Sequence, residues 1–131
     1  MDLLLKDLCA RLPYGVKCFV NYIICNETTD YEDVKSYTVD TLVTINQQTE
    51  SYFFEWLCEW FDIDEFKPYL FPLSSMTTKQ KAELSMLVVG VEDIFKSFLI
   101  EIEFYHKHHI DYRGLIPMGL ALDATGLRIY E

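Results

Sequence analysis

The sequence is poor in the residues that most often carry recognisable chemistry. It has three histidines, five scattered glycines and four cysteines, none of which form a C-x-x-C pair. It also lacks a glycine-rich phosphate loop and a G-x-S-x-G nucleophile motif. These absences exclude the commonest nucleotide-binding and hydrolase signatures. We therefore assign no catalytic residue and expect no cofactor.

Basic residues are scarce as well. Eleven Lys and Arg stand against 21 Asp and Glu, which gives a formal net charge of −10. A surface of this charge repels phosphate backbones and anionic lipids, so direct nucleic-acid binding and membrane binding are disfavoured. It would attract a basic protein partner, although such a charge also simply keeps small domains in solution. Asp62, Asp64 and Glu65 form an acidic cluster, but Lys67 stands where a calcium loop needs glycine.

Long hydrophobic runs are missing too. The longest, Met86 to Val91, is far shorter than the roughly 20 residues of a membrane span. The first residues carry an acid where a signal peptide needs positive charge. We interpret the cysteines as reduced core thiols, and we expect a cytoplasmic protein. These are Cys9, Cys18, Cys25 and Cys58.

Apolar residues, by contrast, are abundant. Half of the 131 residues are hydrophobic and 15% are aromatic. A chain of this length can bury a core without metal or disulfide staples. We predict a single domain over residues 1–131.

The first half of the chain predicts one helix and three strands. Leucines at three- and four-residue spacing predict a helix over 2–12, which ends at Pro13. Strands over 16–25 and 34–45 are expected to form a hairpin around the polar turn 26–30. In the second strand, the alternating row that includes Tyr37, Val39 and Val43 is the expected buried side. A third strand from residue 51 is favoured over a short helix.

The second half predicts a helix pair. Thr77 and Gln80 form a capping box that opens a helix to about Val88. A second helix runs from about Glu92 to His108, and we expect it to bury a stripe through Ile94, Phe95, Phe98, Leu99, Ile102 and either Tyr105 or His106. Pro68 and Pro72 bracket an extended connection, and the apolar tail 111–122 should dock as a helical turn or an added strand. The predicted fold class is α+β, with a small antiparallel sheet of about three strands packed against the N-terminal helix and the C-terminal helix pair.

The histidines and the residues after them form the first candidate site. His106 and His109 lie on one helical face, with Asp111 just beyond. A zinc site needs three or four ligands, and the single Glu-x-x-His cannot make a di-iron centre. The pattern therefore favours a cationic helix end over a metal site, and no metal ligand is assigned. Tyr112 and Arg113 complete the candidate group, since an arginine here could hold an internal or a ligand carboxylate.

A second candidate site consists of aromatic residues. Trp56 and Trp60 would anchor a partner if they are exposed, because aromatic side chains dominate binding hot spots.

Three segments, in the same order along nearly the whole chain, carry a resemblance. They are residues 7–18 (DLCARLPYGVKC), residues 67–77 (KPYLFPLSSMT), and residues 109–116 (HIDYRGLI) running into 119–122 (GLAL). Together they resemble a family of short uncharacterised proteins from gut Bacteroides-type bacteria and their phages or mobile elements. Pro117 stands where that pattern often has a charged residue. The resemblance implies a source and a phage connection, and it carries no catalytic residue across.

Three functions stay open at this point. The favoured one is a non-enzymatic, acidic interaction or accessory protein of phage or mobile-element origin. The alternative is a small metal-binding protein or enzyme with a site near the segment from His106 to Asp111. A third is a structural subunit that works as a homo-oligomer.

Overall fold

The structure, a computed structural model, describes residues 2–24 and 34–131. Its first element is helix α1 (Asp2–Arg11), as the leucine spacing predicted, followed by a 3-10 turn over Leu12–Tyr14. Gly15 then takes a left-handed conformation at φ 70° and turns the chain into the sheet. Leu4 and Leu8 are buried against that sheet.

The described strands form one seven-stranded mixed sheet, so the prediction of about three antiparallel strands was an undercount. Its order is β4-β3-β2-β1-β5-β6, and β7 also pairs with β5. The β1–β2 hairpin and the third strand are confirmed, whereas β5 pairs in parallel with β6 and β7. The bounds are β1 (Lys17–Ile24), β2 (Val34–Asn46), β3 (Ser51–Phe54), β4 (Trp60–Phe61), β5 (Phe66–Pro72), β6 (Ile110–Asp111) and β7 (Leu122–Asp123). Cys25 and the predicted turn 26–30 lie outside the described residues.

The extended connection predicted around Pro68 and Pro72 is strand β5, which lies inside the sheet. The register places Pro68 opposite Cys18 of β1, and Pro72 ends the strand. A proline in a strand loses only its N–H donor, which is tolerated where the ladder does not need it. A 3-10 turn over Ile63–Glu65 leads into β5, and another over Leu73–Ser75 follows it.

Strand β2 forms as predicted, but the side of it that we expected to be buried is the exposed one. Tyr37, Val39 and Val43 are exposed, while Asp40 and Leu42 are buried. The register explains this, because Asp40 lies opposite the buried Cys18, and directly opposed residues share a face. The core under that face is aromatic, with Tyr52, Phe54, Phe61 and Phe66 in edge-to-face contact.

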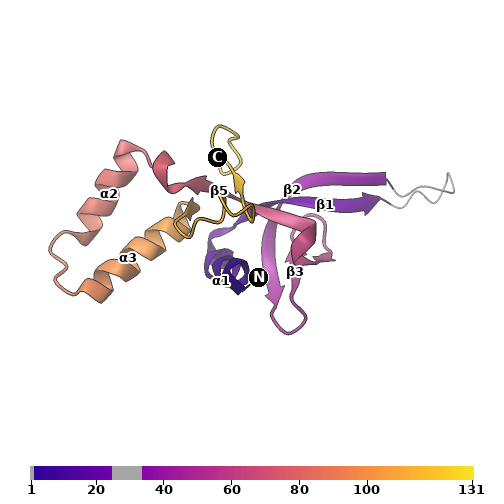
Figure 1. Ribbon diagram of the computed structural model, residues 1–131, viewed down its shortest axis with the longest axis horizontal. Helices are drawn as coiled ribbons and strands as arrows, with labels where there is room; N and C mark the ends of the chain where they lie inside the picture. The colour runs from indigo at the N-terminus through magenta and orange to yellow at the C-terminus, as the bar shows by residue number, and fades with distance from the viewer. Residues whose placement is uncertain (1, 25–33) are drawn as a thin grey trace.

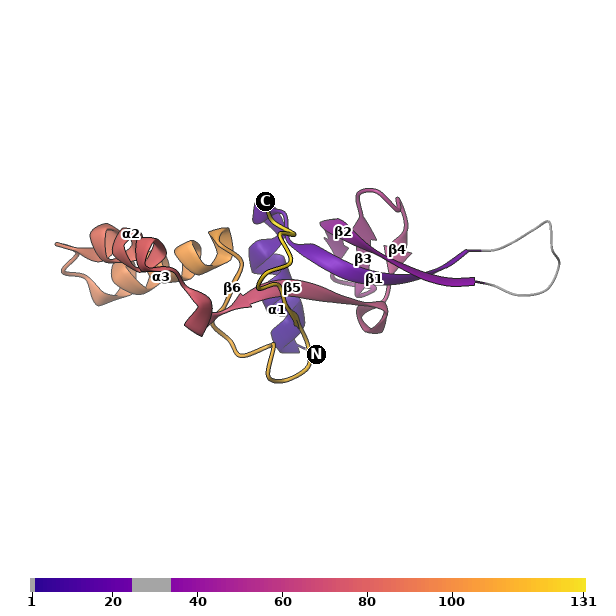
Figure 2. The same cartoon turned by 90° about the horizontal axis from the view of Figure 1, so that it is seen from above.

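The helix pair forms as predicted, but it does not pack on the sheet. Helices α2 (Thr78–Val88) and α3 (Ile94–Lys107) form a hairpin that projects away from the body (Figures 1 and 2). The capping box of Thr77 and Gln80 is present at the start of α2. The predicted buried stripe of α3 is wrong toward the tip, because the large apolar side chains there are exposed: Ile94, Phe95, Phe98 and Leu99. Only the end of α3 nearest the body is buried, through Phe104 and through His106, the last residue of the predicted stripe.

The tail docks on the body, as the sequence predicted. It adds the two-residue strands β6 and β7 beside β5, and it buries Leu115, Ala121 and Ala124. In the described part of the chain, no helix has the length and apolar character needed to cross a bilayer.

Candidate functional site

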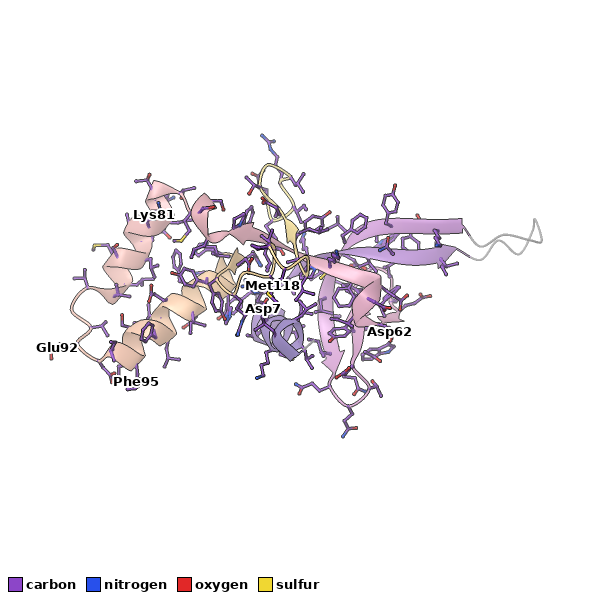
Figure 3. The ribbon with its side chains drawn as sticks, viewed as in Figure 1. Asp7, Asp62, Lys81, Glu92, Phe95 and Met118 are labelled. Carbon is purple, nitrogen blue, oxygen red and sulfur yellow. The ribbon has the colours of Figure 1, made fainter. Side chains whose placement is uncertain are left out.

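A buried ion cluster lies where α1 meets the segment after α3. Arg11 donates from Nε to Asp7 Oδ2 at 2.7 Å, and both side chains are fully buried. Arg113 contacts the other oxygen of the same carboxylate at 3.1 Å. Arg11 also donates to the backbone oxygen of Ile110, so it ties the tail to α1. In Figure 3, Asp7 lies in the centre of the body.

Tyr112 lies against this cluster and links it to α3. Its ring centroid is 5.6 Å from the guanidinium carbon of Arg11 and 5.1 Å from that of Arg113, within cation–π range. Its hydroxyl is 2.8 Å from Nε2 of His106. Burial, followed by the positive charge of Arg11, lowers the pKa of His106, which favours the neutral ring. The structure therefore brings three of the predicted site residues together, around two residues of α1.

Asp111 caps the turn that follows it. Its two carboxylate oxygens accept hydrogen bonds from the backbone N–H groups of Leu115 and Ile116, each at 2.9 Å. The side chain is buried, so these bonds compensate its desolvation. Asp111 therefore has a structural role: its carboxylate accepts the free backbone N–H groups of the turn that follows it.

His109 faces a different part of the molecule from His106. It adopts a left-handed conformation at φ 59°, and its ring stacks on Tyr130 with centroids 3.6 Å apart. Its Nδ1 is buried and has no hydrogen-bond partner among the described residues. Burial, with the nearby charge of Arg11, lowers the pKa of His109 to about 4. The ring lines an open hollow of about 620 Å³ together with Tyr130 and Arg128.

We expect His109 to make the protein sensitive to acid. Its pKa is about 4 when folded and about 6.5 when unfolded, so below pH 6.5 the unfolded state binds more protons. The free energy of unfolding should therefore fall between pH 6.5 and pH 4, by about 2 kcal/mol from this partly exposed group. His109→Asn, which tolerates the left-handed conformation, should flatten that dependence. Urea unfolding of both proteins at pH 7 and at pH 4.5 measures the difference, and equal losses would contradict the assignment.

Within residues 2–24 and 34–131, the histidine segment does not bring three metal-type side chains within reach of one another. Among the described residues, the one group of three or more metal-type side chains within reach of each other is Asp62, Asp64 and Glu65. Asp62 and Glu65 serve there as the capping box of a 3-10 turn, with the N–H of Asp62 donating to Glu65 at 2.9 Å. The local backbone therefore explains this acidic cluster.

The second candidate site lies around strands β3 and β4. Trp56 is 72% exposed and Trp60 is 51% exposed, as a partner anchor requires. The ring of Trp60 packs on that of Phe53 at 5.2 Å. Residues 50–65 carry all of their charge as acid, with no lysine or arginine: Glu50, Glu55, Glu59, Asp62, Asp64 and Glu65. We call residues 50–65 the acidic–aromatic end; Asp62 lies on the far side of the body from the helical hairpin (Figure 3).

Asp40 fixes the turn that presents Trp56. Its buried carboxylate accepts hydrogen bonds from the backbone N–H groups of Trp56, at 3.0 Å, and of Leu57, at 2.8 Å. It also accepts one from its neighbour Thr41 at 2.8 Å. Burial and this carboxylate together raise the pKa of the Cys18 thiol opposite it. The anchor is therefore held by the sheet core.

Several of these residues were not predicted from the sequence as site residues. Arg11 and Asp7 have the four-residue spacing of a helical ion pair, and Arg11 continues the stripe of Leu4 and Leu8, so that signal was present. Asp40 had no such signal, because it sits in the polar row of an alternating strand. Of the cysteines expected in the core, Cys18 is buried, Cys9 is partly buried and Cys58 is exposed. All three are free thiols.

Comparison of the chain with protein-family models, with curated proteins and with solved structures found no match.

Proposed function

We propose that this protein is a non-enzymatic interaction protein that binds a basic protein partner through its acidic–aromatic end. One observation carries the proposal: residues 50–65 hold two exposed tryptophans together with six carboxylates and no basic residue. Six of the 21 acidic residues of the chain lie in this short segment. The segment therefore combines exposed aromatic side chains with a charge of −6, out of the net −10 of the chain.

The chemistry of that surface suits arginine and lysine side chains. Exposed indole rings attract a cation over their faces, and flanking carboxylates add charge complementarity and faster association. The anchoring of the Trp56 turn on Asp40 reduces the conformational entropy that binding would remove. Such a preorganised aromatic anchor is typical of a binding hot spot.

The alternative site near His106 and Asp111 receives less support. His106 is paired with Tyr112, Arg113 with Asp7, and Asp111 with two backbone N–H groups. Each of these contacts stabilises the chain itself. An accessory role in a phage or mobile element, and a cytoplasmic location, remain predictions from the sequence.

The direct test is binding to a labelled peptide rich in arginine and lysine, followed by fluorescence anisotropy. Trp56→Ala combined with Trp60→Ala should weaken binding about 10- to 30-fold, as loss of a hot spot does. Glu55→Gln, Glu59→Gln and Asp64→Asn together should weaken it too, and should flatten its dependence on salt.

The matched control neutralises the same number of carboxylates elsewhere, with Glu83→Gln, Glu103→Gln and Glu131→Gln. Both triple variants have the same net charge, so they separate a local surface from the charge of the whole molecule. The control should bind the peptide almost as well as the wild type. Equal losses in both triple variants would overturn the proposal.

A further inference from the structure

The helical hairpin of α2 and α3 exposes an apolar surface that nothing in the chain covers among the described residues. No residue of α2 is buried, and in α3 Phe95 is 75% exposed and Leu99 is 66% exposed. A groove of about 760 Å³ runs between the two helices; its lining includes Met86, Leu87 and Ile100 and the charged residues Lys79, Glu83, Glu103 and Lys107. A pair of helices that packs against no third element leaves most of its apolar surface in water. Stable folds bury such a surface against another layer of helices or a sheet.

The charge of the hairpin differs from that of the rest of the molecule. Residues 78–107 hold four lysines and five carboxylates, a net charge of −1, which leaves −9 for the remainder of the chain. This near-neutral surface has little attraction for a basic partner, and it does not repel a copy of itself. The difference in net charge therefore indicates that the hairpin and the acidic–aromatic end bind different partners.

The charged residues are also unevenly distributed along the hairpin. The charged residues toward the base, next to the body, sum to a net charge of +1: Lys79, Lys81, Glu83, Glu103 and Lys107. Those at or near the tip sum to −1: Glu92, Asp93 and Lys96. Figure 3 shows Glu92 and Phe95 at the end far from the body. In an antiparallel pair of hairpins, the base of each copy meets the tip of the other. A net positive base would then face a net negative tip at both ends, with the apolar side chains between them.

We propose that the occupant of this surface is a second copy of the chain, which packs antiparallel to form a dimer with a four-helix bundle at its centre. Two αα-hairpins that bury their stripes against each other make such a bundle, with the same patch on both subunits. On each hairpin, seven large apolar residues between Met86 and Leu99 are each more than half exposed. That is several hundred Å², on the order of the roughly 800 Å² per partner in a standard interface.

The geometry keeps the two proposed surfaces independent. The acidic–aromatic end and the hairpin lie on opposite sides of the body (Figure 1). A dimer joined through the hairpins would carry two acidic–aromatic ends, both facing outward. It would bind a partner with two basic sites more tightly than one subunit could.

Sedimentation velocity over a range of micromolar concentrations tests the dimer. We expect the wild type to have twice the 15.4 kDa mass of the chain. Phe95→Glu combined with Leu99→Lys should weaken dimerisation by about 100-fold or more, because each loss occurs twice by symmetry. This variant keeps the net charge and adds a favourable Glu–Lys pair four residues apart on α3, so it should fold. The matched control, Met118→Glu, changes an exposed apolar residue outside the hairpin and should stay dimeric.

A charge swap tests the antiparallel arrangement. Lys79→Glu and Glu92→Lys should each weaken the dimer by about 2- to 30-fold, and the two together should restore it, because each ion pair forms twice. A wild type that stays at 15.4 kDa at every concentration would overturn the proposal. So would a dimer that survives Phe95→Glu with Leu99→Lys, or one that dissociates on Tyr37→Glu at the exposed sheet face. Peptide binding by the monomeric variant keeps this test separate from that of the proposed function.

Discussion

Replacing Arg11 by methionine is expected to lower the free energy of unfolding by about 3–5 kcal/mol, the largest effect that we predict for a single substitution. Arg11 and Asp7 are fully buried, and the substitution leaves the carboxylate with Arg113 alone. It also removes the hydrogen bond to Ile110 that ties the tail to α1. The total free energy of unfolding of a small domain is about 5–15 kcal/mol, so urea unfolding should detect this loss readily.

Two further variants separate a buried charge effect from a packing effect. Asp7→Leu with Arg11→Met should be less destabilised than Arg11→Met alone, because no uncompensated carboxylate then remains. Arg128→Met should change stability by no more than about 0.5 kcal/mol, since that arginine is 82% exposed and lies 3.7 Å from Glu131. If Arg11→Met behaved like Arg128→Met, the buried cluster would not be a main source of stability.

Asp40→Ala is the second substitution with a large expected effect, a loss of about 2–4 kcal/mol. It removes a buried charged acceptor from three backbone N–H groups, and two of these belong to the turn that carries Trp56. Asp40→Asn should lose about half as much, because one amide oxygen can still accept. Binding of the basic peptide should fall in Asp40→Ala as well, because the turn is no longer held.

Urea unfolding measures the stability of these variants, and fluorescence anisotropy measures peptide binding. Asp64→Ala is the matched control, since it removes an exposed carboxylate of the acidic–aromatic end without touching the Asp40 bonds. It should weaken binding slightly and leave stability unchanged. A stable Asp40→Ala with unaltered peptide binding would show that Asp40 does not position Trp56.

Local patterns in the sequence predicted the elements of this fold better than their packing. Helix α1, the β1–β2 hairpin and the start of α2 follow from leucine spacing, alternation and a capping box, which act over a few residues. The buried face of β2 depends instead on its register with β1. An alternating strand has two faces, and the opposed Cys18 decides that Asp40 lies inward.

The apolar stripe of α3 also shows that a local pattern predicts an element better than its packing. Ile94, Phe95, Phe98 and Leu99 predicted an amphipathic helix, and the helix is there. Periodicity indicates an apolar face but does not say what covers it. Within the described chain nothing covers this face, so burial on the sheet was the wrong inference.

The candidate site was predictable only in part. His106, Tyr112 and Arg113 do come together, but their centre is Arg11 and Asp7, which are about a hundred residues away along the chain. Trp56 and Trp60 are exposed, as a partner anchor requires. Their link to Asp40 depends on how β2 and β3 pair, which no local pattern encodes.

The most direct test of the acidic–aromatic end is a titration with the basic peptide followed by NMR at two salt concentrations. The protein has two tryptophans, so each indole N–H gives its own signal. We predict that both indole signals and the backbone amides of residues 50–65 shift together and saturate, and that added salt weakens the binding. Shifts spread over carboxylates throughout the molecule, with both indole signals unmoved, would contradict the account.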